Sequence, residues 1–248
     1  MAPALPSNVL PSPAPAQDRP TVLVTGANRG IGLEYARQFH AKGYRVIGTA
    51  RDLADATELA KVSDRVEALD VTDAASVAAL AQRLKGVPID ILVNNAGMFD
   101  RSDTAVEKVD FETMEQTFAV NTLGPLRMVQ ALLPNLRAGK RKLIVNMSSQ
   151  LGSIGNSTGE WYAYRASKAA LNQINRSLSV ELGKEGFRSV VLHPGWVRTD
   201  MGGEQATYTP EESVTGLITV IEGLGPDDNG RFLDFRGRHL RHLAGGRF

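Results

Sequence analysis

The chain alternates short apolar runs with longer segments in which apolar residues recur at helical spacing. Seven of the short runs are mostly continuous in apolar character, which is typical of parallel strands that are covered on both faces. The seven runs are Thr21–Thr25, Tyr44–Ala50, Val66–Val71, Ile89–Asn94, Lys142–Met147, Ser189–His193 and Arg231–Phe235.

Helical patterns fill most of the stretches between these runs. They are Ile31–Lys42, Ala74–Leu84, Met114–Leu136 with a break expected near Gly124-Pro125, Tyr162–Leu182, and a segment near Thr209–Ile221. Because strand–helix alternation requires right-handed crossovers, the strands are expected to lie parallel in one sheet. The pattern therefore predicts a single doubly wound α/β domain with a seven-stranded parallel sheet and helices on both faces.

The first 20 residues differ in composition from the rest of the chain. They hold six of the 12 prolines and show no apolar periodicity, so residues 1–20 are predicted to be a disordered or loosely attached arm, with the domain spanning 21–248. The arm lacks the basic start and apolar core of a secretory signal. No window of about 18 apolar residues exists, so no membrane segment is expected and a cytoplasmic location is predicted.

The overall charge and the residue types present exclude several classes of function. Lys and Arg number 28 against 27 Asp and Glu, so the chain as a whole shows no footprint for nucleic acid. Cysteine is absent, which excludes disulfides, thiolate catalysis and Cys-ligated zinc, and the four histidines show no metal-ligand spacing. Glycine, at 24 of 248 residues, is more frequent than the usual ~7%.

A glycine cluster lies where the first predicted strand meets the first predicted helix, in the order strand, Thr25-Gly26-Ala27-Asn28-Arg29-Gly30-Ile31-Gly32, helix. Gly26 permits a tight turn, Gly30 lets backbone approach a pyrophosphate, and Gly32 lets the helix pack on the strand. The helix N-terminus then offers unpaired N–H groups to phosphates.

With its G-x-x-x-G-x-G spacing, this turn resembles the cofactor loop of the short-chain dehydrogenase/reductase family. Further motifs resembling that family follow in order up to about residue 235: Asn94-Asn95-Ala96-Gly97, Ser149, Tyr164-x-x-x-Lys168 and Pro194-Gly195. The resemblance implies a Rossmann-type fold and a nicotinamide dinucleotide cofactor. The cofactor contacts that it implies are Gly26, Asn28, Arg29, Gly30, Ile31, Gly32, Asn94, Ala96, Gly97, Tyr164, Lys168, Pro194, Gly195, Val197 and Thr199.

The residues after the second predicted strand indicate which dinucleotide is bound. An acid at this point would repel a 2′-phosphate, but the chain has Arg51 there, and Arg29 supplies a second cation. Both resemble the members that prefer NADP(H); the alternative is that they are plain surface arginines. Asp70 and Val71 resemble a pair that contacts adenine, although Asp70 could equally cap the following turn.

Tyr164 and Lys168 are the main candidates for acid–base chemistry. Four residues apart, they share one face of a helix. A free phenol has a pKa of ~10, and a neighbouring positive charge lowers that pKa, so Lys168 and the cationic ring of oxidised nicotinamide are together expected to activate Tyr164. By family resemblance, Tyr164 exchanges a proton with the substrate oxygen while Lys168 also binds the nicotinamide ribose. Tyr162 has no lysine at the matching position.

Ser149 and Asn121 complete the predicted catalytic set. Ser149 is followed by Gln150-Leu151-Gly152, which fits the family pattern, whereas the adjacent Ser148 does not. The Ser149 hydroxyl is expected to polarise the substrate carbonyl. The family uses an asparagine at the position of Asn121 to hold a water that relays protons to the lysine, and an asparagine here would also disturb the helix locally.

The residues expected to line the substrate pocket are mostly apolar: Met98 and Phe99, with Leu151, Ile154, Trp161 and Trp196. They predict a hydrophobic ketone or aldehyde, or the corresponding alcohol, although core packing is an equal alternative for the two tryptophans. The segment that follows Pro194-Gly195 is short, which predicts an open cleft.

The sequence most resembles the carbonyl-reductase and C-signal-like branch of the family. That resemblance implies an enzyme that reduces a small-molecule carbonyl reversibly with NADPH, in a homodimer or homotetramer. The alternative is a non-catalytic NADP(H)-binding sensor or signalling protein; the presence of Ser149, Tyr164 and Lys168 together favours the enzyme.

Overall fold

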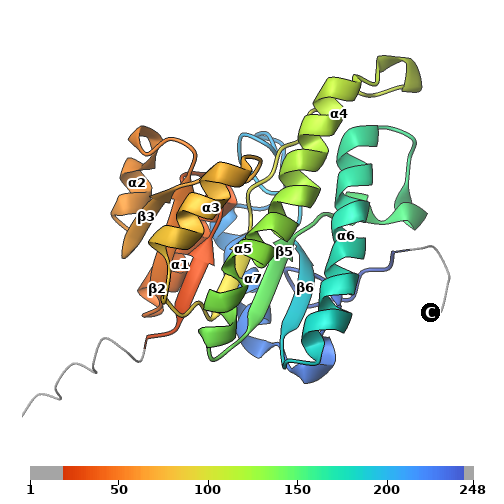
Figure 1. Cartoon of the computed structure of the whole chain (residues 1–248). Helices are drawn as coiled ribbons and strands as arrows, with labels where there is room; N and C mark the ends of the chain where they lie inside the picture. The colour runs from red at the N-terminus through yellow and green to blue at the C-terminus, as the bar shows by residue number, and fades with distance from the viewer. Residues whose placement is uncertain (1–18, 243–248) are drawn as a thin grey trace, which may run out of the picture.

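The computed structural model describes residues 19–242 and builds them around one parallel sheet in the order β3-β2-β1-β4-β5-β6-β7 (Figure 1). The strands are β1 (Thr21–Val24), β2 (Arg45–Ala50), β3 (Arg65–Ala68), β4 (Ile91–Asn94), β5 (Leu143–Met147), β6 (Arg188–His193) and β7 (Phe232–Asp234). Every residue of the central strands β1, β4 and β5 is buried, as expected for strands covered on both faces. The predicted seven-stranded Rossmann-type sheet is confirmed.

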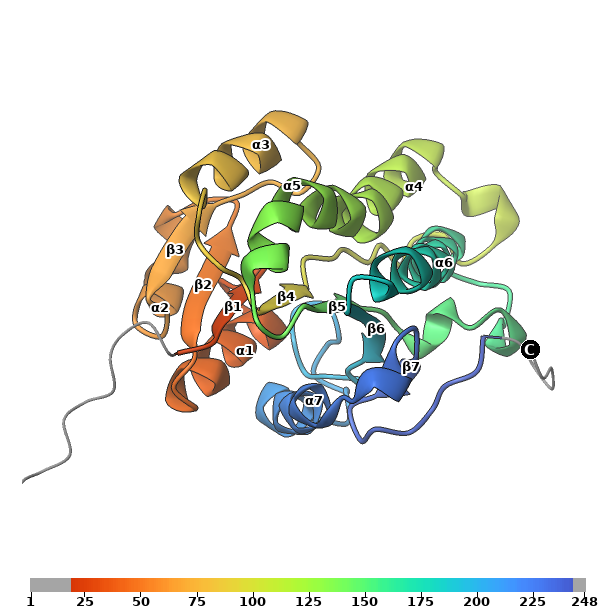
Figure 2. The same ribbon diagram turned by 60° about the horizontal axis from the view of Figure 1, so that its bottom comes forward.

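Two layers of helices cover the sheet, which Figure 2 shows nearly edge-on. The helices are α1 (Gly30–Ala41), α2 (Thr57–Ala60), α3 (Ala74–Arg83), α4 (Phe111–Phe118), α5 (Gly124–Ala138), α6 (Tyr162–Gly183) and α7 (Pro210–Gly223). On one face, Tyr35 and Phe39 of α1 join Leu217 and Ile221 of α7 in one buried cluster. On the other face, α3, α5 and α6 bury a second cluster that includes Leu132. The sheet therefore separates two cores.

The expected break in the Met114–Leu136 helix is a widened turn. Between α4 and α5 the chain forms a π-helical segment, Ala119–Leu123, and α5 begins at Gly124 with Pro125 in its first turn. A Cβ on Gly124 would lie 2.9 Å from Cγ2 of Val71, so only glycine fits this close approach. The short helix α2 had no signal in the sequence pattern, and the third strand ends at Ala68, three residues before its predicted end.

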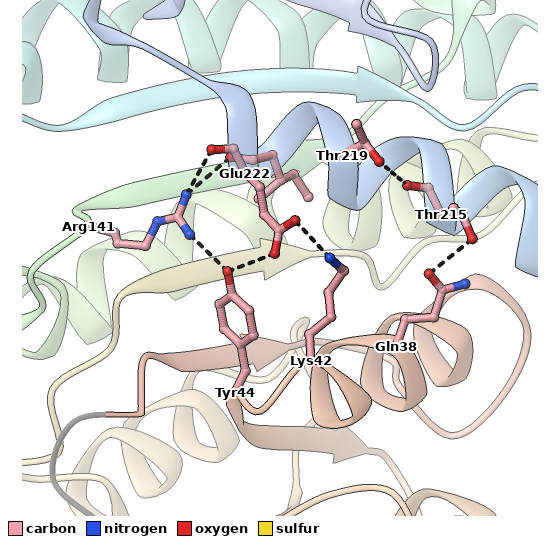
Figure 3. A network of polar contacts seen from close by, with 8 residues as sticks. Gln38, Lys42, Tyr44, Arg141, Thr215, Thr219 and Glu222 are labelled. Carbon is pink, nitrogen blue, oxygen red and sulfur yellow. Dashed lines mark hydrogen bonds and ion pairs between the residues drawn. The ribbon is translucent and has the colours of Figure 1, made fainter. Parts of the chain in front are cut away.

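A polar network fastens α1 to α7 at the edge of the sheet where the strands begin (Figure 3). Glu222, near the end of α7, accepts from Lys42 Nζ at 2.9 Å and from the Tyr44 hydroxyl at 3.2 Å. Arg141, which precedes β5, donates to the same hydroxyl at 2.9 Å. Burial raises the pKa of the Tyr44 phenol, so this hydroxyl stays a neutral donor and acceptor. This network is called the α1–α7 clamp below.

Only the end of the predicted N-terminal arm lies within the described residues. There, Arg19 binds Asp64 with Nη1 to Oδ1 at 2.8 Å, and its Nε donates to the Gly43 carbonyl at 3.0 Å. The remainder of the predicted arm, residues 1–18, lies outside the described part of the chain.

No helix within residues 19–242 is both long enough and apolar enough to cross a membrane. The longest of them, α6, has 22 residues and carries Arg165, Lys168 and Arg176.

Candidate active site

The candidate residues gather at the edge of the sheet where the parallel strands end. The chain crosses from β3 on one side of β1 to β4 on the other, which makes a topological switch point between β1 and β4. In open α/β sheets, ligands bind in the crevice outside the strand ends at such a point. The glycine turn follows β1 and the Asn94–Gly97 motif follows β4, so the fold brings these two predicted cofactor motifs side by side.

The glycine turn has the geometry of a phosphate cradle. Gly26 and Gly30 adopt φ values of +61° and +54°, which side chains disfavour. A Cβ on Gly32 would lie 2.2 Å from the Gly26 carbonyl oxygen, so α1 begins in direct contact with the turn. No side chain caps the N-terminus of α1 at Arg29, which leaves its first N–H groups available to an anion. These residues fit the diphosphate of a dinucleotide.

Asn95 fixes the glycine turn to β4, a role for which the sequence analysis had not singled it out. Its Nδ2 donates to the carbonyl oxygens of Thr25 and Gly26, both at 3.0 Å. In return, the Thr25 hydroxyl accepts from the backbone N–H groups of Asn95 and Ala96 at 3.0 Å. The signal that would have found it is its place inside the Asn94–Gly97 motif. Asn94 itself points into the sheet and donates to Asn146 Oδ1 at 2.8 Å.

The two arginines predicted to select NADP(H) lie in different surroundings. Arg51 is exposed at the end of β2, and its charge is one of the weaker causes that lower the pKa of Asp70. Arg29 pairs with Asp200 at 2.7 Å in an ion pair whose side chains are 69% and 76% exposed. Because an ion pair this exposed is weak, a bound phosphate would compete effectively for Arg29.

Asp70 takes the turn-capping arrangement that the sequence analysis left open. Its Oδ1 accepts from the Thr72 hydroxyl at 2.7 Å and from the Thr72 backbone N–H at 2.8 Å. The hydrogen bond from the Thr72 hydroxyl is the main cause that holds the pKa of Asp70 below its usual range. Val71 is buried against Gly124, so contact of this pair with adenine stays a prediction.

Tyr164, Lys168 and Ser149 converge on one buried point between β5 and α6. Tyr164 and Lys168 lie on the inward face of α6 with exposures of 8% and 5%, and Ser149, directly beyond β5, is 7% exposed. Lys168 Nζ lies 5.6 Å from the centroid of the Tyr164 ring and donates to the Met147 carbonyl at 2.8 Å. The fold thus assembles three members of the predicted catalytic set.

Electrostatics at this point differ from the sequence-based expectation. Burial raises the pKa of the Tyr164 phenol to about 12, while a hydrogen bond with Ser149 and the charge of Arg101 act to lower it. Burial also lowers the pKa of the Lys168 ammonium to about 8. Lys168 is not among the groups that act on the pKa of Tyr164 in the structure, so activation of the phenol by Lys168 together with a nicotinamide cation stays a prediction. Desolvation disfavours both charges, and Arg101 is the cation that acts on the phenol.

Asn121 lies at the centre of the π-helical turn and is fully buried. Its side chain accepts from the Met98 N–H and donates to the Met98 carbonyl, both at 2.9 Å, and it also donates to the Ser167 hydroxyl at 3.1 Å. A Cβ on Gly97 would lie 3.4 Å from Asn121 Oδ1 and 3.7 Å from Lys168 Nζ. Since Gly97 is exposed and carries no side chain, a ligand has an open approach to Lys168 across it.

The segment after β6 crosses toward the glycine turn. Thr199 packs against Gly30: a Cβ on Gly30 would lie 3.2 Å from Thr199 Cγ2. Val197, in the same segment, is buried and pairs with Tyr208. Gly195 has a φ of +83°, and a Cβ there would lie 2.8 Å from the Tyr208 ring, so packing already favours glycine at this position. Its contact with a cofactor stays a prediction. Pro194 accepts a hydrogen bond from the Ser213 hydroxyl at 2.7 Å.

The structure does not bring the predicted substrate-pocket residues together in one place. Trp161 is connected to the candidate Tyr164 by Phe99, whose ring centroid lies 5.5 Å from that of Trp161 and stacks on Tyr164 at 4.1 Å. Leu151 and Ile154 instead line a separate cavity of about 130 Å³ on another face of α6, beside Arg165. Trp196 is half exposed and donates to the Gly202 carbonyl, and the Met98 backbone is held by Asn121.

Asp103 is a further residue at the site that sequence reasoning missed. It is buried, its Oδ2 accepts from the Ala163 N–H at 2.7 Å, and its carbonyl accepts from the Trp161 N–H at 2.9 Å. Trp161, the residue at the helix N-terminus, adopts φ +57° and supplies no side-chain cap. Asp103 therefore caps the helix that carries Tyr164 from a loop 60 positions earlier. No local sequence pattern marks such a distant cap.

Among residues 19–242, no group of three or more His, Asp or Glu side chains is arranged to hold a metal ion.

Comparisons with known proteins agree with this arrangement. The sequence profile of the short chain dehydrogenase family matches residues 20–209. The C-signal of Myxococcus xanthus is 49% identical over 154 residues, covering 62% of this chain and 92% of that protein. A 1-hydroxy-2-glutathionyl-2-methyl-3-butene dehydrogenase of Rhodococcus sp. (strain AD45) is 40% identical over 229 residues, covering 89% and 99%.

Among solved structures, the NADPH-bound carbonyl reductase from chicken fatty liver superimposes with a TM-score of 0.83 at 36% identity, covering 90% of this chain and 99% of that one. The predicted resemblance to carbonyl reductases and C-signal is thus confirmed. The matched profile, the sheet order and the relatives together show that this chain belongs to the short chain dehydrogenase family.

Proposed function

We propose that this protein is an NADPH-dependent carbonyl reductase that converts a ketone or aldehyde to an alcohol. The observation that carries the proposal is the buried Tyr164 phenol, hydrogen-bonded with Ser149 and sharing a helix face with Lys168. The NADPH-bound reductase that resembles this chain supports the same reaction.

The cofactor would be held by the glycine turn between Gly26 and Gly32, by Gly97 and Lys168, and by the segment from Pro194 to Thr199. Arg51 and Arg29 are the groups proposed to bind the 2′-phosphate, since no acid stands directly after β2 to repel it. Bound NADPH supplies the hydride for the reduction.

The protein's own groups handle the proton. The Ser149 hydroxyl donates a hydrogen bond to the carbonyl oxygen, and Tyr164 donates its proton to the same oxygen. Since burial holds the pKa of Tyr164 at about 12, the phenol is protonated at neutral pH, which is the form that reduction requires. Lys168, whose pKa burial lowers to about 8 and whose Nζ lies 5.6 Å from the Tyr164 ring centroid, would return a proton toward the phenol.

The deciding experiment is NADPH oxidation with a panel of ketones and aldehydes, comparing the wild type with Tyr164→Phe. Loss of a general acid is expected to lower kcat by about 10²-fold or more. Tyr162→Phe is the matched control, because Tyr162 lies on the same helix turn but is exposed. Undiminished turnover in Tyr164→Phe would overturn the mechanism. Cofactor binding without turnover in the wild type would favour the alternative of an NADP(H)-binding signalling protein. The similarity to C-signal is the observation that supports this alternative.

The cofactor proposal has its own test. Arg51→Asp is expected to raise the KM for NADPH by about 10- to 100-fold, since a hydrogen bond to a charged group contributes about 1.5–3 kcal/mol. The KM for NADH, which lacks the phosphate, is expected to change little. Equal changes for both cofactors would refute the 2′-phosphate assignment.

A further inference from the structure

The loop that follows Gly97 places an exposed cation, Arg101, beside an aromatic ring that contacts Tyr164. Phe99 stacks on Tyr164, with ring centroids 4.1 Å apart and an interplanar angle of 25°, and meets Trp161 edge-on at 5.5 Å. On the same ring, the Arg101 guanidinium carbon lies 5.0 Å from the Phe99 centroid. Arg101 and Tyr164 are thus joined through a single aromatic ring.

The charge of Arg101 is felt at the reacting phenol. The guanidinium carbon lies 5.0 Å from the Phe99 centroid, which lies 4.1 Å from the Tyr164 centroid, so the charge is within roughly 9 Å of the Tyr164 ring. This separation is comparable with the Debye length of about 8 Å at physiological salt. Consistent with that distance, Arg101 is the only charged group that acts on the pKa of Tyr164 in the described structure, after burial and the Ser149 hydrogen bond.

Arg101 has no carboxylate partner among residues 19–242. Its Nη2 donates to two neutral groups, the Met201 carbonyl at 2.7 Å and the Gly202 carbonyl at 3.4 Å. Both acids of its own loop are engaged elsewhere: Asp100 accepts from the Ser102 N–H, and Asp103 caps α6. An exposed guanidinium in this position keeps donors available for an anion.

We infer that Arg101 binds an anionic group of the substrate, so that the preferred substrates are carbonyl compounds whose apolar body carries a carboxylate. The apolar body would lie along Phe99 and Trp161 with its carbonyl at Tyr164, and the carboxylate would meet Arg101. A planar guanidinium binds a carboxylate through two parallel hydrogen bonds, which gives both affinity and orientation. This inference rests on the proposed reductase activity and narrows the hydrophobic ketone or aldehyde expected from the sequence.

The test compares two substrates that differ only in charge, para-carboxybenzaldehyde and its methyl ester, at saturating NADPH. The ratio of their kcat/KM values is measured in the wild type, Arg101→Gln and Arg101→Lys. Arg101→Gln is expected to lower the acid-to-ester ratio by about tenfold, equivalent to about 1.4 kcal/mol. The change should arise mainly in the KM of the acid. Arg101→Lys is expected to be intermediate, since it keeps the charge but loses the planar fork.

Using the ratio removes effects that both substrates share, such as looser contact with Met201 or a shifted pKa of Tyr164. Arg137→Gln is the control for losing one positive charge far from the site, where Arg137 pairs with Glu185 at 2.7 Å. Its ratio should equal that of the wild type. Added salt should shrink the ratio of the wild type more than that of Arg101→Gln.

Binding gives a second readout that does not depend on turnover. The two alcohols, para-(hydroxymethyl)benzoate and its methyl ester, are titrated by calorimetry into each protein in the presence of NADP⁺. A Kd ratio that favours the acid in the wild type and falls in Arg101→Gln supports the anion site. Unchanged ratios in both assays, with ester turnover intact, would overturn the anion site and leave the reductase proposal standing. Absence of turnover with both aldehydes and with the whole panel of ketones and aldehydes would overturn the reductase proposal, and the Kd ratio would still decide the anion site.

Discussion

Replacing Asp103 with alanine removes the cap from the helix that carries Tyr164 and Lys168. The carboxylate accepts from the Ala163 N–H at 2.7 Å, one residue before the proposed catalytic Tyr164, and Asp103 is only 4% exposed. Because Trp161 supplies no side-chain cap, nothing on α6 itself replaces this contact. The first turn of α6 is therefore expected to loosen at the point where it presents Tyr164.

The expected cost follows from the burial and the charge of the cap. Losing an N-cap typically costs ~1 kcal/mol, and losing a hydrogen bond to a charged group costs about 1.5–3 kcal/mol. Because Asp103 is both buried and charged, the cost of losing it is expected at the upper end of these two ranges. Asp103→Ala is therefore expected to lower the free energy of unfolding by about 2–3 kcal/mol. For a chain of this size, that corresponds to a fall in Tm of about 4–12 °C.

Activity should fall together with stability. A small displacement of a catalytic group can cost up to about 10²-fold, so kcat for carbonyl reduction is expected to fall by about 10- to 100-fold well below the Tm. Asp103→Asn keeps an acceptor oxygen for the Ala163 N–H and should restore most of kcat. Both quantities are measured on the same preparations, Tm by calorimetry and kcat by NADPH oxidation.

The matched control is Asp73→Ala, which removes the cap of α3, where Asp73 accepts from the Ala75 N–H at 2.9 Å. Asp73 is exposed and α3 carries no candidate catalytic residue, so the variant should lose about 0.5–1 kcal/mol with kcat unchanged. An Asp103→Ala protein with the Tm of the wild type would refute the capping argument. Lower stability with full kcat would refute the positioning of Tyr164.

Two further predictions concern groups buried at or beside the site. Lys168→Met should be more stable than the wild type at pH 7, by on the order of 3 kcal/mol. Burial lowers the pKa of Lys168 to about 8, so the unfolded wild type binds this proton more tightly than the folded one, and at pH 7 that difference favours unfolding. Urea unfolding should show this advantage shrinking as the pH rises from about 8 to 10.5, and a pH-independent advantage would contradict the assignment. Gly195→Ala should destabilise more than Gly203→Ala: both glycines have φ near +80°, but only at Gly195 would a Cβ meet a ring, that of Tyr208, at 2.8 Å. Equal shifts in the urea midpoint would show that backbone strain alone is responsible.

The elements that the sequence predicted correctly depend on local pattern. Continuous apolar runs located all seven strands, and the spacing of Gly26, Gly30 and Gly32 located the turn before α1. Both features depend on residues that are close in the sequence, so a local pattern is enough to predict them. The helix face shared by Tyr164 and Lys168 follows from their separation alone. The strand ends were less accurate, since pairing with β2 stops at Ala68 while the apolar pattern continues.

Features that depend on distant contacts were not predictable in the same way. Asp103 and Ala163 are 60 positions apart, and only the completed fold brings a loop after β4 to the start of α6. The stacking of Phe99 on Tyr164 and the low pKa of Lys168 likewise come from packing and desolvation, which no local pattern records. The packing of Gly195 against the rings of Tyr208 and Phe235 also becomes visible only in the completed fold.

The position of the α1–α7 clamp has a consequence for changing this protein by design. The clamp joins Lys42, Tyr44, Arg141 and Glu222 at the edge where the strands begin (Figure 3). The candidate catalytic residues lie beyond the opposite edge of the sheet. Loop residues on that opposite edge, such as those from Phe99 to Ser102, can therefore be exchanged without touching the contacts that hold these two helices together, provided that Met98 and Asp103 keep their bonds to Asn121 and Ala163. The scaffold is suited to loop libraries that alter substrate range, with the clamp left unchanged as a fixed base.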